Sequence, residues 1–181
     1  MYLIITASPN ADGLTAACGR AAVRGIEQAG KVGEIVDLCA LKIQACLICG
    51  NGWGSCLKEH RCVIDDGLGT LQSRLKETEG LVLVTPVYWG QQSERTKYFC
   101  DRLRRCEATK GDESILAGKK MNLVAAAGGT GNGTISCLTD MELWCRHMRA
   151  VPFERIGVTR FTREAMLSVI EKASIELVKA L

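Results

Sequence analysis

The sequence predicts an α/β protein in which helices cover both faces of a doubly wound parallel sheet of five strands. Short apolar runs alternate with longer segments of helical period along all 181 residues. The first apolar run is unbroken, as in a strand buried on both faces. Strands separated by helices form parallel sheets with right-handed crossovers. Because no repeat, low-complexity tract or linker divides the chain, we expect a single domain over residues 1–181.

The expected strands are short apolar runs bounded by polar residues, Gly or Pro. Pro86 cannot continue a central ladder, so the third strand is expected to leave the sheet there. The five strands are predicted at residues 2–7, 34–38, 81–87, 119–127 and 153–158.

The expected helices carry apolar side chains at spacings of three and four residues. The first, 14–29, ends at Gly30, and Asp65 or Asp66 is expected to cap the next, which turns Leu68, Leu71 and Leu75 inward. Two more are expected at 93–106 and 135–148, before a C-terminal helix. The apolar residues in phase along the last two helices are Ile135, Leu138, Met141, Cys145, Met148, Met166, Val169, Ile170, Ala173 and Leu177.

Charge and composition exclude several classes of protein. The net charge is +3 and no long basic run occurs, which argues against nucleic acid or an anionic membrane as the main partner. The start of the chain has no basic leader and its apolar run is too short to span a bilayer. We therefore expect a cytoplasmic protein without membrane insertion. In that compartment the ten cysteines are expected to stay reduced, most of them as small buried apolar residues.

In a doubly wound sheet, ligands bind beyond the carboxyl ends of the strands. The loop after the first strand, 8–15, offers donors from Ser8, Asn10 and Thr15, while Gly13 lets the backbone turn and Leu14 begins the helix. Backbone amides at a helix start favour a phosphate dianion. The alternative is an ordinary helix cap and turn.

Two further loops at the same edge have unusual composition. After the third strand, Tyr88 and Trp89 could stack on a planar ring, with Gly90 letting the backbone approach it; the alternative is that they roof the core or fill a subunit contact. After the fourth strand, four glycines fall between Gly128 and Gly133. Such a loop suits close approach of backbone to a ligand, or is a mobile connection.

Motifs of other nucleotide-binding and phosphate-binding proteins are missing or misplaced. The chain has no GxxxxGK[ST] and no GxGxxG after the first strand, which argues against a P-loop NTPase and a Rossmann dinucleotide fold. Cys18 and Arg24 have the spacing of phosphotyrosine phosphatases, but Cys18 is expected inside the first helix, where it would not be an exposed nucleophile.

Taken in order, SPNADGLT, TPVYWG…SE…K…DRL and AAAGGTGNG resemble the flavodoxin-like NAD(P)H-dependent FMN reductase family, including its iron-sulfur flavoprotein branch. The resemblance covers almost the whole chain. It implies strand order 2-1-3-4-5, FMN as cofactor, NAD(P)H as substrate and assembly into a homodimer or homotetramer. Ser93, Lys97, Asp101 and Arg102 match the family's helix after the second loop, where we expect capping and ion pairing. The implied FMN contacts are Ser8, Asn10, Gly13, Leu14 and Thr15 for the phosphate and Pro86, Val87, Tyr88, Trp89, Gly90, Ala127, Gly128 and Gly129 for the ring.

Three functions follow from this resemblance. In the first, electrons pass from NAD(P)H through the flavin to a small-molecule acceptor, a quinone, azo, nitro or flavin compound, without a catalytic side chain. In the second, the protein is a one-electron carrier from FMN through an iron-sulfur cluster to a partner protein. The third is a non-catalytic flavin- or zinc-binding redox module.

A cysteine-bearing loop at 42–63 carries Cys46, Cys49, Cys56 and Cys62 in the pattern C-x2-C-x6-C-x5-C. Four thiolates at such spacing suit a 4Fe-4S cluster or zinc. The iron-sulfur branch has its third cysteine where Gly52 stands here. His60 could substitute as a ligand, and the remaining alternative is a set of reduced thiols at a subunit interface.

Overall fold

A parallel sheet lies at the centre of the computed structural model, which describes residues 1–180. The strands are β1 (Tyr2–Thr6), β2 (Gly33–Asp37), β3 (Gly80–Tyr88), β4 (Gln91–Gln92), β5 (Lys120–Ala127) and β6 (Val151–Thr159). The parallel strands follow the order β2-β1-β3-β5-β6, and β4 pairs antiparallel with the end of β3. Counting only the parallel strands gives 2-1-3-4-5, so the predicted fold is confirmed. The short β4 was not predicted.

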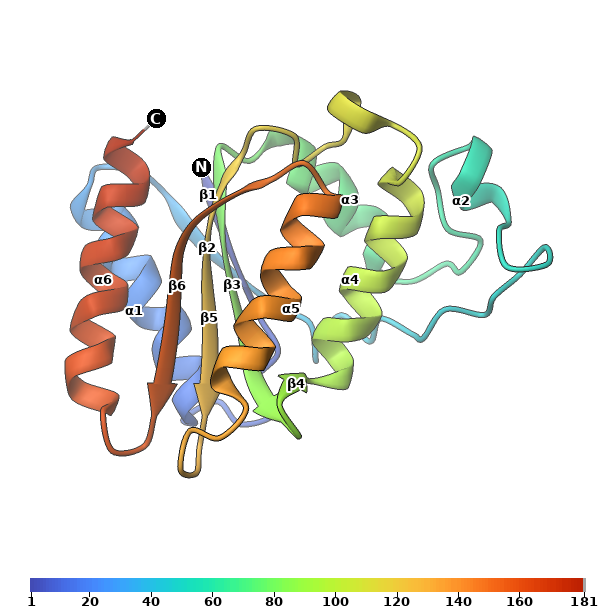
Figure 1. Ribbon diagram of the computed structural model, residues 1–181. Coiled ribbons are helices and arrows are strands. Elements are labelled where there is room, and N and C mark those ends of the chain that lie inside the picture. The colour runs from blue at the N-terminus through green and yellow to red at the C-terminus, as the bar shows by residue number, and fades with distance from the viewer. Residues whose placement is uncertain (181) are drawn as a thin grey trace.

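Helices cover both faces of the sheet (Figure 1). They are α1 (Leu14–Gln28), α2 (Ser55–Lys58), α3 (Gly67–Glu77), α4 (Glu94–Glu107), α5 (Thr134–His147) and α6 (Arg163–Lys179), with a 3-10 turn η1 (Gly111–Glu113). One face packs against α1 and α6, and the other against α3, α4 and α5. Within the described residues no helix is both long and apolar enough to cross a membrane.

The two faces of the central strands contribute to two separate cores. In β1, Leu3 and Ile5 face α3 and α4, whereas Tyr2 and Ile4 face α1 and α6. Because alternate side chains of a strand point to opposite faces, a strand covered on both sides needs apolar residues at every position. This explains the unbroken apolar run that predicted β1.

Two residues of the predicted helical stripes lie outside these cores. Val169 is 42% exposed and Ile135 is 82% exposed. The buried face of α6 is centred on Ile170, Ala173 and Leu177, so Val169, one position earlier, points sideways. Ile135 lies in the first turn of α5, at the end of the helix where the glycine loop enters it.

The expectation that the third strand leaves the sheet at Pro86 is wrong. Pro86 pairs in register with Ala126 of β5, and β3 continues to Tyr88. The last β1 residue paired with β3 is Thr6, opposite Val84. Beyond that point β3 has a parallel neighbour on one side only, and a proline without an N–H is tolerated at such a position.

The cysteine-bearing loop lies away from the sheet, outside α4 (Figure 1). It leaves β2, forms the four-residue helix α2, and returns to α3. The side chain of Asp66 caps α3 by accepting a hydrogen bond from the Leu68 amide at 3.1 Å, which confirms the predicted helix start.

Candidate functional site

Three loops meet at one rim of the sheet because β1, β3 and β5 are neighbours and parallel. The loops that follow these strands, 7–13, 89–93 and 128–133, leave from the same edge, drawn at the bottom of Figure 1. The residues for which the family resemblance implied contact with FMN all lie in these loops, in the adjoining strand ends or at the start of α1.

The first loop leads into a helix start without a side-chain cap. Gly13 is the extended residue before α1, with φ −68° and ψ 172°, and among residues 1–180 no side chain caps it. The hydroxyl of Ser8 donates to the backbone carbonyl of Asn10 at 2.6 Å. The first turn of α1 carries no acidic residue. Its amides and positive dipole end therefore suit an anion.

Side chains cap two of the long helices, α3 and α4, whereas α5 and α6, like α1, begin without a side-chain cap in the described part of the chain. Asp66 caps α3, and the hydroxyl of Ser93 caps α4 by accepting from the Thr96 amide at 3.4 Å. Within the described residues α1 thus starts at a glycine without a side-chain cap, and the expected turn is present, because the Gly13 amide donates to the Asn10 carbonyl at 3.2 Å. Thr15 is buried in the first turn, and Leu14 is half-buried beside it.

The second loop is a tight hairpin. Val87 pairs with Gln92 and Tyr88 with Gln91, so that Trp89 and Gly90 form a two-residue turn. Both turn residues have positive φ, 52° and 78°, as a type I′ turn requires. Trp89 is fully exposed and Tyr88 is 42% exposed. Neither side chain roofs the core, which leaves a ligand or a subunit contact for them.

The third loop packs against this hairpin. A Cβ added to Gly133 would lie 2.4 Å from the Cα of Gly90. The hydroxyl of Ser136 donates to the Gly90 carbonyl at 2.8 Å and to the Gly133 carbonyl at 3.0 Å. Gly128 and Gly129 are exposed, and a Cβ at either would meet no atom of the described residues within 4 Å. The end of the third loop, at Gly133, is thus fixed against the hairpin, whereas its beginning, at Gly128 and Gly129, has open space beside it.

The helix after the hairpin is held as the sequence predicted. Thr85 accepts hydrogen bonds from the Ser93 amide at 3.1 Å and the Thr96 hydroxyl at 2.8 Å. Lys97 forms an ion pair with Asp101, and Arg102 forms one with Asp66. Capping and ion pairing at these four matched positions are thereby confirmed.

Cys18 is not a phosphatase nucleophile. It lies inside α1 with no exposed surface, and burial raises the pKa of its thiol to about 12. Such a thiol stays protonated and unreactive at neutral pH.

The four cysteines of the loop line one narrow cavity, here called the thiol cavity. Cys56 is buried, and the other three are half-buried. The residues lining the cavity are Cys46, Leu47, Cys49, Ser55, Cys56, Cys62, Val63, Ile64, Arg102 and Arg105. Within residues 1–180, no group of three or more His, Cys, Asp or Glu has the arrangement that holds a metal ion. The four thiols therefore line one cavity without surrounding a single metal ion.

The backbone around the thiol cavity adopts rare conformations. Ile48, Asn51 and His60 have φ between 51° and 58°, in the left-handed region, which is a marked outlier for a β-branched residue such as Ile48. The Ile48 amide donates to the Cys46 sulfur at 3.4 Å. A Cβ on Gly54 would lie 2.6 Å from the Cys49 sulfur. The loop is thus shaped around its sulfurs.

Two arginines of α4 fasten this loop. The Arg102 guanidinium, 1% exposed, donates to Asp66, to the Gln44 carbonyl at 3.2 Å and to the Ile64 carbonyl at 3.5 Å. Burial acts to lower the pKa of Arg102, but the neighbouring Asp66 carboxylate and Cys62 thiol outweigh burial and raise that pKa. The Arg105 guanidinium donates to the Gly52 carbonyl and lies 4.9 Å from the ring centre of Trp53.

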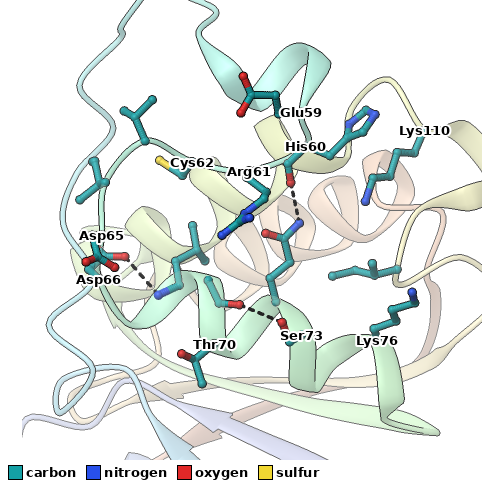
Figure 2. A pocket seen from close by; sticks show the side chains of 16 residues that line it. Glu59, His60, Arg61, Cys62, Asp65, Asp66, Thr70, Ser73, Lys76 and Lys110 are labelled. Atoms are coloured by element: carbon teal, nitrogen blue, oxygen red, sulfur yellow. Dashed lines mark hydrogen bonds between the residues drawn. The ribbon is translucent and has the colours of Figure 1, made fainter.

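His60 does not belong to the thiol cavity. Its Nδ1 lies 3.0 Å from the Cys106 carbonyl oxygen, and the residue lines a different cavity of about 980 Å³ (Figure 2). That cavity lies between the end of the cysteine loop and α3, with Arg61, Lys76 and Lys110 among its lining residues. No residue of the three-loop rim lines it. The structure therefore gives no support to His60 as a substitute ligand.

Comparison with known proteins agrees with this arrangement. A family model described as NADPH-dependent FMN reductase matches residues 2–161. An iron-sulfur flavoprotein of Methanocaldococcus jannaschii is 31% identical over 100 residues, which are 55% of this chain and 50% of that protein. One from Archaeoglobus fulgidus is 31% identical over 129 residues, 71% of this chain and 62% of its own. The chain thus spans about half to three fifths of the length of these relatives.

Solved structures share the fold. A flavone reductase superposes with a TM-score of 0.77 at 14% identity, over 99% of this chain and 62% of its own. The NAD(P)H:quinone oxidoreductase from Methanothermobacter marburgensis gives 0.73 at 16% identity, over 97% of this chain and 94% of its own.

Proposed function

The chain belongs to the NADPH-dependent FMN reductase family, and we propose that it binds FMN at the three-loop rim and passes electrons from NADPH or NADH to a small-molecule acceptor. The observation that carries this proposal is the uncapped start of α1 beside the hairpin and the glycine loop. One end of that rim suits a phosphate and the other suits a flat ring. Acceptors of the quinone, azo, nitro or flavin type fit an open flavin face.

The residues at the rim would share the work of holding the cofactor. The phosphate would be held by Ser8, Asn10, Gly13, Leu14 and Thr15. The ring would be flanked by Pro86, Val87, Tyr88, Trp89, Gly90, Ala127, Gly128 and Gly129. Bound FMN supplies the hydride and electron chemistry, and the chain orients it. In a homodimer or homotetramer of the kind the family resemblance implies, a second copy would cover the exposed Trp89.

The backbone would tune the site electrostatically. Amides of the hairpin and the glycine loop are fixed in place by the contact between Gly90 and Gly133. Donors fixed in advance stabilise negative charge without reorganising. Open space beside Gly128 and Gly129 leaves room for a planar group to approach the backbone.

Titration with FMN tests the proposal. We expect the flavin fluorescence to be quenched, the melting temperature to rise, and NADPH or NADH to bleach the bound flavin. Thr15→Glu, which places a carboxylate at the start of α1, should abolish FMN retention. Because Thr15 is buried, the isosteric Thr15→Val is the safer variant. Loss of one hydrogen bond to a charged group should weaken FMN binding roughly tenfold or more.

Thr139→Glu is the matched control, since it adds the same charge to an exposed threonine of another helix. It should bind FMN like the unchanged protein. Unaltered FMN affinity in both Thr15 variants would contradict the phosphate loop.

A second function is favoured by the thiol cavity. We propose that the four cysteines hold a 4Fe-4S cluster, in keeping with the name iron-sulfur flavoprotein that the relatives carry. In this proposal the protein passes single electrons through the cluster to a partner protein. The donor set fits, because four thiolates bind such a cluster, although the loop must close further around it. Anaerobic purification separates the candidates. Four irons per chain support the carrier; zinc without flavin would support a non-catalytic module.

A further inference from the structure

Arg102 has a feature that its structural contacts leave unexplained. Its Nε is buried and has no hydrogen-bond partner within residues 1–180. The other guanidinium nitrogens are used by Asp66 and two carbonyls. A buried N–H without an acceptor is destabilising, so native proteins almost always supply one.

The thiol cavity is where such an acceptor would lie. Arg102 lines that cavity together with all four cysteines. The second arginine there, Arg105, is already engaged with Gly52 and Trp53. Arg102 therefore provides the buried positive charge with a donor to spare.

We infer that Arg102 is the positioning residue and charge partner of a cluster bound by Cys46, Cys49, Cys56 and Cys62, an inference that rests on the carrier function proposed above. Through Asp66, Gln44 and Ile64 it fixes the loop on α4, and its Nε, without a partner within residues 1–180, is the donor left for a sulfur of the cluster. Four thiolates give a 4Fe-4S cluster a net charge of about −2, and one added electron makes it more negative. A buried cation beside it stabilises the reduced form and raises the reduction potential.

The test is a redox titration of the anaerobically prepared holoprotein with dithionite as the one-electron reductant. Arg102→Met removes the charge and the donor. At a fixed potential we expect the ratio of reduced to oxidised cluster to fall about tenfold, which is about 59 mV for one electron. Arg102→Lys keeps the charge and should recover part of this shift.

Two controls separate this role from a structural one. Arg104→Met makes the same change of charge on the same helix, at a residue that does not line the thiol cavity. Asp66→Asn breaks the ion pair but keeps the guanidinium. Arg104→Met should retain the potential of the unchanged protein, whereas Asp66→Asn, which removes a buried negative charge beside Arg102, should keep the iron and raise the potential. Iron content, FMN content and circular dichroism are measured for every variant.

The outcomes divide clearly. If Arg102→Met loses its iron while Asp66→Asn keeps it, the positioning role is supported. If both lose iron, or if Arg102→Met keeps both iron and potential, the inference is overturned. If the unchanged protein binds no iron, the carrier function itself has failed and the inference falls with it, whereas FMN binding at the rim is unaffected.

Discussion

Among single residues, the buried side-chain amide of Asn122 is the clearest source of instability. Asn122 on β5 is 1% exposed, and neither its amide nitrogen nor its oxygen has a partner within the described part of the chain. Its neighbour in register, Val82, faces the core of α1 and α6. Asn122→Leu, which keeps the branched skeleton of four side-chain heavy atoms, should therefore raise the free energy of unfolding by about 1–2 kcal/mol in urea titrations.

Asn122→Ala serves as the comparison, because it removes the same amide but leaves a cavity, and it should be less stable than the Leu variant. Destabilisation by Asn122→Leu would mean that the amide is satisfied by a buried water.

Residue patterns predicted which loops meet at one edge of the sheet better than they predicted which side chains are exposed. The composition of the first loop pointed to an anion at the start of α1, and the structure adds that no side chain of the described residues caps that helix. The contact between Gly90 and Gly133 could not be predicted, since it joins residues 43 positions apart. The sequence nevertheless showed glycine at both positions, which indicated that the backbone could approach another group closely there.

At the scale of elements, the packing of α1 on α6 depends on one glycine. A Cβ on Gly25 would lie 2.1 Å from the Glu171 carbonyl oxygen and 2.9 Å from the Ser174 Cβ. Gly25→Ala would push the two helices apart, and we expect a loss of about 2–4 kcal/mol of unfolding free energy by denaturant titration.

Gly69→Ala in α3 is the matched control. A Cβ there meets nothing within 4 Å among the described residues, so the substitution should stabilise the protein by about 0.5–1 kcal/mol through helix propensity. Equal effects at the two positions would show that helix propensity, and not close packing, governs Gly25.

The sequence predicted the long elements and missed the short ones. Long periodic segments such as α3, α4 and α6 were predicted, because several turns repeat the same spacing. The two-residue β4 and four-residue α2 were not, since neither completes a recognisable period. Convergence of the four cysteines on one cavity was anticipated from spacing, whereas the part played by Arg102 needed the three-dimensional contact between α4 and the loop.

At the scale of the whole molecule, buried thiols make stability depend on alkaline pH. Burial raises the pKa of Cys18, Cys137 and Cys145 from 9.0 to about 12. Above pH 9 these thiols ionise when the chain unfolds but stay protonated in the fold, so unfolding releases protons. Their contribution is complete below pH 9 and is lost as the pH rises toward 12.

Cys18→Ala tests this linkage at a helical position that tolerates alanine. One thiol accounts for a slope of about 1.4 kcal/mol per pH unit, so the variant should lose unfolding free energy less steeply than the unchanged protein between pH 9.5 and 11. Urea unfolding with a reductant present measures both slopes, and the difference at pH 7–8 gives the packing cost alone. Parallel pH profiles would mean that the Cys18 thiol ionises equally in both states, which its complete burial argues against.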